Sequence, residues 1–555
     1  MPDRNASAFR ACVVIVLLAC LIPASSAANP ATKLYVGHAA RLTARIPSGW
    51  QVEPKSQFDY AGSDGFVVSE PVLGQDLDEA CSKLAESRFG STATSAKSTL
   101  SGVPVCRLDG RVQDAEATAL VIPHPHPFET FGEEYSYIGL ISDPGHLDAI
   151  AATVSFSPEL VTAEAYVASV LDIVEARSYW SSEVDWEVTR AEAMDAVEGL
   201  ETLTFTQNAL VGVLRKLQAA GDNHSFLVPP GPGNQLDDAN GFGLLVGGNQ
   251  VILVYPDSPA GRAGVQTGDL VEALNGRPYA ATSDLIDPSY VWGSAADLTF
   301  SRPGDAGDRT VRLEQGPYSL YVPPAGRRLA DDVGYLVIYG FTAFGQEVDY
   351  AAEARRVIAE IDRTPTCGWV IDLRLNTGGS YFPMVTGVGP ILGNGTFVGW
   401  EYADGTQTWV TYDDGRIVDD GIEISNYLAD REFAELHVSD PPVAILTSPY
   451  TGSSGEVTTL AFVGRPDTRL FGEQTGGYTT ANAGYSLFDG SFLGLAEAAM
   501  ADRTGAVYPD GIKPDAPVDI DWTQFATNDD PVLNAATEWV TQQSACAGVE
   551  LSPAA

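Results

Sequence analysis

Three short apolar segments in the C-terminal half, at 334–338, 369–373 and 443–446, most strongly constrain the fold. Their length and composition are typical of strands that are buried on both faces of a sheet. An amphipathic helical pattern at 348–361 separates the first two segments. Because parallel strands need a long crossover connection, this alternation predicts a largely parallel sheet covered by helices. The segment 394–420 alternates polar and apolar residues around Asp-Gly turns, which predicts a hairpin insert.

Two further units precede this sheet. Residues 28–156 combine short strand-like runs with a helical piece at 77–88, which predicts a small α/β domain whose sequence indicates no function. Residues 157–235 carry apolar side chains at helical spacing, for example Leu210, Val213, Leu214 and Leu217, and we expect a helical unit there. The chain is therefore predicted to be an α/β protein of several domains.

The N-terminus is typical of an export signal. Arg4 and Arg10 precede an apolar run at 11–23, and small residues at 24–27 suit cleavage by a signal peptidase. The run is shorter than the roughly 20 residues that span a bilayer, and we expect no transmembrane segment in the mature chain. We therefore interpret 1–27 as a signal peptide and expect an exported protein that is secreted, periplasmic or at the cell surface. The alternative is a lipid anchor at Cys20, which ends an approximate lipobox.

Charge and cysteine content exclude several classes of function. The chain has 73 acidic and 32 basic residues, a net charge of −41, which argues against nucleic acid as a partner. Removal of the signal leaves four cysteines, which allow three pairings; Cys81 and Cys106 lie in the same unit and could form a disulfide. No CxxC pair or histidine-rich cluster is present, so we expect neither a metal site nor a cofactor.

A candidate nucleophile directly follows the third apolar segment. Ser453 and Ser454 lie where that strand is expected to turn into a helix, beside free backbone amides that would suit a serine facing an oxyanion. The same residues, followed by Glu456, also fit a helix capping box. Spacing alone does not decide between the two interpretations.

Residues 236–318 resemble a PDZ domain. The string SPAGRAGVQTGD at 258–269, followed by Asn275-Gly276, is typical of that family, and Gly241, Phe242, Gly243 and Leu244 match its carboxylate-binding loop. The resemblance implies that a peptide C-terminus is captured by adding a strand to the edge of the sheet. Whether this groove is open is not indicated by the sequence.

Four further strings occur in a fixed order: DLRLNTGG at 372–379, TGSSGE at 451–456, GEQTGG at 472–477 and DGIKPD at 510–515. With the PDZ-like unit upstream, they resemble the C-terminal (tail-specific) processing peptidases, a family of serine proteases. The resemblance implies a crotonase-like α/β protease core at 319–542, a helical cap at 157–235 and a C-terminal tail at 543–555. It assigns the nucleophile to Ser453 and the oxyanion amides to Ser454 and to Gly378 or Gly379.

The family uses either a lysine or a histidine to activate its serine. The lysine position here holds Tyr478, and no lysine lies between 217 and 512. The resemblance to the tricorn-core branch instead assigns the general base to His224, in a loop that closes the helical segment. That branch orients its histidine with a preceding serine and a distal glutamate, whereas this chain has Asn223 and, near the distal position, Asp510.

These observations predict an exported serine endopeptidase that acts on proteins or peptides by a Ser–His mechanism, with its PDZ domain recognising a C-terminus. The alternative is a catalytically silent protein that binds a ligand or peptide on the same fold. The sequence indicates no oligomeric state.

Overall fold

The computed structural model describes residues 32–52, 59–90, 93–112, 115–130, 133–158, 161–230, 238–280, 282–286, 293–302, 307–343, 345–428 and 435–547. The expected signal peptide at 1–27 and the alternative lipid site at Cys20 lie outside these residues. Within them, no helix combines the length and the apolar character needed to cross a membrane.

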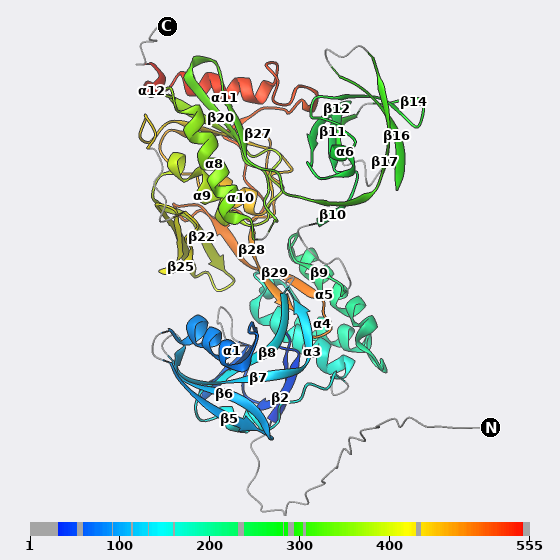
Figure 1. Ribbon diagram of the computed structural model, residues 1–555, viewed down its shortest axis with the longest axis vertical. Coiled ribbons are helices and arrows are strands. Elements are labelled where there is room, and N and C mark those ends of the chain that lie inside the picture. The colour runs from blue at the N-terminus through cyan, green and yellow to red at the C-terminus, as the bar shows by residue number, and fades with distance from the viewer. Residues whose placement is uncertain are drawn as a thin grey trace, which may run out of the picture.

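The N-terminal unit is an antiparallel sheet of six strands, in the spatial order β3-β4-β8-β7-β6-β5 (Figure 1). Helix α1 (Leu77–Leu84) packs on one face, and Asp76 caps it by accepting from the N–H of Glu79. The hairpin β1-β2 and helix α2 cover the other face. A disulfide joins Cys81 to Cys106, which confirms that these two cysteines pair. The remaining bounds are β1 Thr32–Gly37, β2 Leu42–Pro47, β3 Tyr60–Gly62, β4 Gly65–Val72, β5 Thr94–Leu100, β6 Val103–Val112, β7 Ala115–Thr130, β8 Glu133–Ser142 and α2 Leu147–Ala151.

The helical segment forms three main helices, α3 (Ala163–Arg177), α4 (Trp186–Asp195) and α5 (Thr206–Ala220). Their apolar faces make one core that also includes Leu493 and Leu495 of strand β29, so the helices pack on a strand of the C-terminal region. Helix α5 ends at Gly221, whose φ of +123° turns the chain sharply away from the helix axis.

Residues 238–319 form a small β-unit with its own core. Its main sheet has the order β15-β11-β12-β13-β16-β17, and a separate pair joins β10 to β18. Strand β11 pairs with β12 on one side, and on the other side its residues 246–248 pair with β15. The edge of β11 is thus already occupied over its last three residues. The bounds are β10 Asp238–Gly241, β11 Leu244–Gly248, β12 Gln250–Val254, α6 Pro259–Arg262, β13 Leu270–Leu274, β14 Arg277–Pro278, β15 Thr282–Ile286, β16 Ala295–Ser301, β17 Arg309–Glu314 and β18 Gly316–Ser319.

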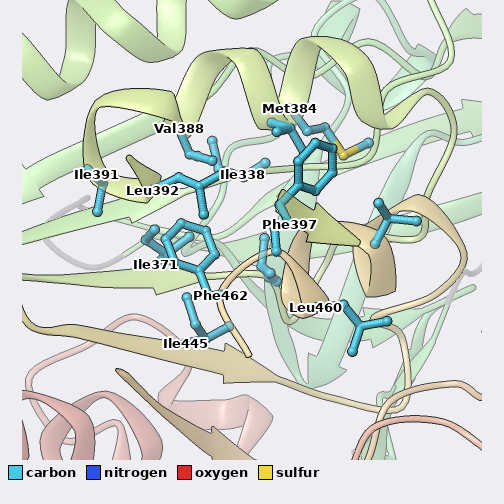
Figure 2. Packing of buried hydrophobic residues seen from close by; sticks show 14 of the residues in the cluster. Ile338, Ile371, Met384, Val388, Ile391, Leu392, Phe397, Ile445, Leu460 and Phe462 are labelled. Carbon is cyan, nitrogen blue, oxygen red and sulfur yellow. The ribbon is translucent and has the colours of Figure 1, made fainter. Parts of the chain in front are cut away.

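A mostly parallel sheet, β19-β20-β21-β26-β27-β30, forms the centre of the C-terminal region. All its neighbouring pairs from β20 to β30 are parallel, which confirms the predicted topology. Helices α8 and α9 pack on one face, where Ile338, Ile371 and Ile445 meet Val388 and Leu392 (Figure 2). The bounds are β19 Ala325–Arg328, β20 Val333–Val337, α8 Glu347–Ile361, β21 Gly368–Asp372, α9 Tyr381–Leu392, β26 Val443–Thr447, α10 Ser454–Leu460, β27 Thr468–Gly472, β30 Ala516–Pro517 and α11 Pro531–Thr541.

A second sheet, β25-β24-β23-β22-β29-β28, is antiparallel and connects the C-terminal region to the helical segment (Figure 1). The predicted hairpin insert forms its first strands. Strand β29 also pairs with the short strand β9, which directly follows the loop of His224. The helical segment is therefore joined to the C-terminal region by backbone hydrogen bonds. The bounds are β9 Phe226–Val228, β22 Gly395–Tyr402, β23 Gln407–Asp413, β24 Arg416–Asp419, β25 Ile422–Ser425, β28 Thr480–Ser486 and β29 Phe492–Ala501.

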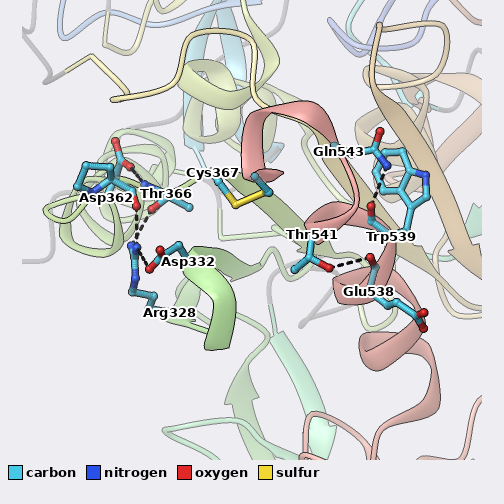
Figure 3. The surroundings of a disulfide bond; sticks show 11 residues. Arg328, Asp332, Asp362, Thr366, Cys367, Glu538, Trp539, Thr541 and Gln543 are labelled. Atoms are coloured by element: carbon cyan, nitrogen blue, oxygen red, sulfur yellow. Dashed lines mark hydrogen bonds and ion pairs between the residues drawn. A yellow bond between two sulfur atoms is a disulfide. The ribbon is translucent and has the colours of Figure 1, made fainter. Parts of the chain in front are cut away.

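The segment expected as a C-terminal tail, 543–555, begins with helix α12 (Ser544–Ala547), which follows α11. Cys546 in this helix forms a disulfide with Cys367, the residue before β21 (Figure 3). This disulfide attaches the start of the tail to the central sheet. Residues 548–555 lie outside the described part of the chain.

Candidate active site

The turn between β26 and α10 holds Ser453 in a strained conformation. Its φ of +51° is costly for a residue with a side chain, and such strain is typically found at functional sites. Two bonds fix the approach to the turn: the Gly452 N–H donates to the Asn376 carbonyl at 3.0 Å, and the Thr451 hydroxyl to the Leu373 carbonyl at 2.9 Å. Ser453 itself is partly exposed between buried neighbours. The serine is thus held rigidly and remains accessible.

The glycine turn at 378–379 lies directly against this serine. A Cβ on Gly378 would come within 2.8 Å of the Ser453 Cβ, so a side chain there would push the two turns apart. The Gly378 N–H donates to the Asn376 side-chain oxygen at 3.1 Å, whereas Gly379 is exposed. Considering only described residues, the N–H groups of Gly379 and Ser454 have no acceptor. Of the two glycines expected from the sequence, Gly379 is the one with an available amide.

Glu456 connects the turn that carries Ser453 to the loop that follows β27. Its buried carboxylate accepts the Ser453 N–H and the Gly477 N–H, both at 2.9 Å, and the Thr475 hydroxyl. Burial raises its pKa to about 7, although these hydrogen bonds act in the opposite direction. The residue is therefore more than a helix cap, because it ties together two segments of the site.

His224 follows α5 in a turn that Asp222 organises. The buried Asp222 carboxylate accepts the N–H groups of His224 at 2.9 Å and Ser225 at 2.8 Å. The His224 Nδ1 lies 2.9 Å from the Thr480 hydroxyl in β28. Burial lowers the pKa of His224 to about 4, against the raising effects of Asp222 and Thr480. The imidazole is neutral near pH 7, and with Nδ1–H donating to Thr480 its Nε2 lone pair is free to accept a proton.

The histidine loop is attached to the C-terminal region at three points. Asn223 donates to the Gly477 carbonyl at 2.7 Å, and Asn482 donates to the His224 carbonyl at 2.9 Å. The Ser225 hydroxyl accepts the Ala496 N–H at 2.9 Å. Gly477 is bonded on one side to the histidine loop and on the other to Glu456. One short loop, 475–478, thus connects the histidine turn with the serine turn.

The side chain of Tyr478 lies between the two turns. Its ring centroid is 5.4 Å from that of His224, and its ring lies 3.2 Å from the position of a Cβ built on Gly452. The structure therefore brings Ser453 and His224 to the same loop. Across the described chain, no hydrogen bond joins the Ser453 hydroxyl to the His224 ring. Catalytic hydrogen bonds are often long without a substrate.

The two residues considered for orienting the histidine have other contacts. Asn223 donates to Gly477, and the Asp510 carbonyl accepts from the Gln474 side chain at 2.7 Å. The residue whose side chain contacts the His224 Nδ1 is Thr480, which is not among the residues expected from the sequence. Thr480 lies two residues beyond Tyr478, and in an extended segment such residues share a face, so the sequence could have indicated that Thr480 lies near the same site as Tyr478.

The predicted peptide-binding loop is closely packed. Phe242 and Leu244 are buried, and Gly243 has a φ of +69° with its carbonyl accepting the Ser258 hydroxyl at 3.0 Å. The Phe242 carbonyl accepts the Ala260 N–H at 2.9 Å. Gly241, the first of the four residues, ends β10 and is buried. These contacts fix the loop at the N-terminal end of β11.

Comparison with known proteins gives one family and several relatives. The model of peptidase family S41 matches residues 332–518. A nisin-resistance protein of Lactococcus lactis subsp. lactis is 34% identical over 273 residues, which is 49% of this chain and 77% of that protein. A carboxy-terminal-processing protease of Bartonella bacilliformis is 23% identical over 329 residues, covering 56% of this chain and 69% of its own length. A solved lipoprotein structure from Streptococcus agalactiae, at 20% identity and a TM-score of 0.44, covers 68% of this chain and 96% of that one.

Proposed function

We propose that this chain, which belongs to peptidase family S41, is an exported serine endopeptidase that cleaves proteins or peptides by a Ser–His mechanism. The observation that carries the proposal is the shared loop 475–478, which is bonded to the serine turn through Glu456 and to the histidine turn through Asn223. Two disulfides support export, because such bonds form and persist in oxidising compartments.

In this mechanism the Ser453 hydroxyl attacks the substrate carbonyl while His224 Nε2 accepts its proton. The N–H groups of Gly379 and Ser454 then donate to the oxyanion of the tetrahedral intermediate. His224 returns the proton to the leaving amine, and an acyl-enzyme remains on Ser453. A water molecule, deprotonated by His224, releases the new C-terminus and restores the serine.

Thr480 is the positioning residue of this mechanism. By accepting the Nδ1 proton of His224, it keeps the Nε2 lone pair available and fixes the plane of the ring. Asp222 holds the turn that carries the histidine, and its charge raises the pKa of the ring against the effect of burial. No carboxylate is needed at Nδ1 in this arrangement, because the Thr480 hydroxyl fulfils the orienting role.

A fluorophosphonate probe tests this assignment on the purified protein. We expect labelling of the wild type and its loss in both Ser453→Ala and His224→Ala, together with loss of peptide hydrolysis. A hydrolysis rate in Ser453→Ala equal to the wild type would refute it. A folded wild type that neither reacts with the probe nor cleaves peptides would instead favour the silent ligand- or peptide-binding protein.

We also propose that the PDZ-like unit, 236–318, binds the C-terminus of the substrate. The fixed loop at Gly241–Gly243 supports this role, whereas β15 occupies the edge of β11 from residue 246 onward. A peptide strand must therefore pair with the start of β11 or displace β15. If the unit recognises a C-terminus, amidation of a substrate's terminal carboxylate will lower kcat/KM; equal rates for both forms would exclude it.

A second candidate substrate class follows from the relative with 34% identity, which is named for nisin resistance. We propose peptide antibiotics such as nisin as this second substrate class, to be tested beside protein substrates. Cleavage of nisin by the wild type and not by Ser453→Ala would place this chain with that relative. Intact nisin under conditions where other peptides are cleaved would exclude this role.

A further inference from the structure

We infer that the ring of Tyr478 forms one wall of a substrate subsite, which accepts an apolar side chain on the residue that follows the scissile bond. This inference rests on the proposed peptidase function and specifies its substrate preference. Tyr478 lies in the loop that is bonded to both the serine and the histidine turns, and the proposed mechanism gives its side chain no role.

The ring is exposed although its backbone is fixed. Its side chain is 42% exposed, while the preceding residue, Gly477, is held by Glu456 through its N–H and by Asn223 through its carbonyl. The Glu456 carboxylate also interacts with the Tyr478 N–H. A large aromatic side chain on a fixed backbone is available to contact a ligand at little cost in conformational entropy.

Two glycines, Gly452 and Gly476, leave the space that the ring of Tyr478 occupies. The ring lies 3.2 Å from a Cβ built on Gly452 and 3.1 Å from one built on Gly476, so a side chain at either position would displace it. Gly452 immediately precedes the proposed nucleophile, and the centroid of the His224 ring is 5.4 Å from that of Tyr478. The tyrosine is therefore held beside both reacting groups.

The position of the histidine identifies which part of the substrate reaches the ring. His224 must protonate the leaving amine, so the residue that carries this amine lies on the histidine side of Ser453. The oxyanion amides of Gly379 and Ser454 receive the carbonyl oxygen of the preceding residue. A side chain on the leaving residue consequently meets the exposed face of Tyr478, where an aromatic or branched aliphatic group would cover the ring.

The experiment compares cleavage of a peptide library, randomised around the cut, by the full-length wild type and by Tyr478→Ala and Tyr478→Phe. We expect the wild type to prefer aromatic or branched aliphatic residues after the cut over alanine. Tyr478→Ala should reduce this preference, as a ratio of kcat/KM values, by about tenfold, and Tyr478→Phe should retain it. Phe205→Ala serves as a matched control, because Phe205 is an aromatic residue of the helical segment that is 62% exposed.

Three outcomes would overturn the inference while leaving the peptidase assignment intact. The first is a wild type without any preference after the cut, and the second is an unchanged preference in Tyr478→Ala. The third is an equal loss of rate for every peptide in Tyr478→Ala with a shifted pH profile, which would mean that the ring only shields His224 from water. Hydrolysis that persists in Ser453→Ala would refute the proposed function itself, whatever the Tyr478 variants show.

Discussion

Replacing Thr480 by valine isolates the hydrogen bond that orients the general base. Thr480 is buried in β28, and its hydroxyl is 2.9 Å from the His224 Nδ1. Valine has the same shape and suits a strand, so the exchange removes the acceptor and little else. The bond between the hydroxyl and Nδ1 is then lost, and only the backbone of Thr480 remains near this side of the ring, so the imidazole is oriented less strongly toward the tautomer that keeps Nε2 free.

The magnitude follows from the cost of an unpaired buried donor. Leaving one such group unsatisfied costs about 1–3 kcal/mol, and about 1.4 kcal/mol corresponds to a tenfold change in rate. Because the Thr480 hydroxyl is the acceptor at Nδ1, we expect kcat/KM to fall about tenfold to a hundredfold in Thr480→Val. Most of the loss should be in kcat, since Thr480 acts in the proposed mechanism through the His224 ring.

The assay is steady-state hydrolysis of one peptide by the wild type, Thr480→Val and the matched control Thr480→Ser, which restores a hydroxyl. Circular dichroism verifies that all three are folded. The reasoning is refuted if Thr480→Val has the kcat of the wild type, or if a folded Thr480→Ser loses as much activity as Thr480→Val.

Three further predictions concern ionisation and the core. Because burial lowers the pKa of His224 to about 4, kcat/KM should fall only as the pH drops through about 4, and an inflection at 6.5 would contradict this. The raised pKa of Glu456, about 7, means that the folded state holds its proton more tightly; its stabilising contribution is lost as the pH rises from 4.5 through 7. Amide hydrogen exchange of residues 453–456 should therefore become faster over this pH range, by more than the intrinsic pH dependence of exchange. The Glu456→Gln variant should not show this additional acceleration. Arg374 is fully buried between Asp372 and Asp530, so Arg374→Met should destabilise the core by about 3–5 kcal/mol, measured as a lower thermal midpoint; an unchanged midpoint would refute this.

The parallel sheet and the turn that carries Ser453 could be predicted because their signals are local. Buried strands such as 369–373 are contiguous apolar runs, and Ser453 lies in a motif of consecutive residues directly after a strand. Recognising either pattern does not require knowledge of a distant partner. The family resemblance then distinguished between the capping and catalytic interpretations, and the structure shows that Glu456 takes part in more than a cap.

Contacts between distant segments could not be predicted in the same way. Thr480 is 256 positions from His224 in the sequence, and their contact depends on the docking of the histidine loop on β28. The pairing of Cys367 with Cys546 likewise required a folded chain, since four cysteines allowed three arrangements. Strand β15 pairs with the edge of β11, and no local sequence pattern indicates which strand will pair with that edge.

For the proposed mechanism, the pairing of β9 with β29 means that the two reacting residues can meet only after β29 has been synthesised. His224 is synthesised long before Ser453, and β9 has no partner strand until β29 has been made and folded against β28. In the proposed exported peptidase, a chain that is still crossing a membrane would therefore have a histidine without its docking strand. We expect such a chain to be inert toward itself and toward the export apparatus until β29 has folded.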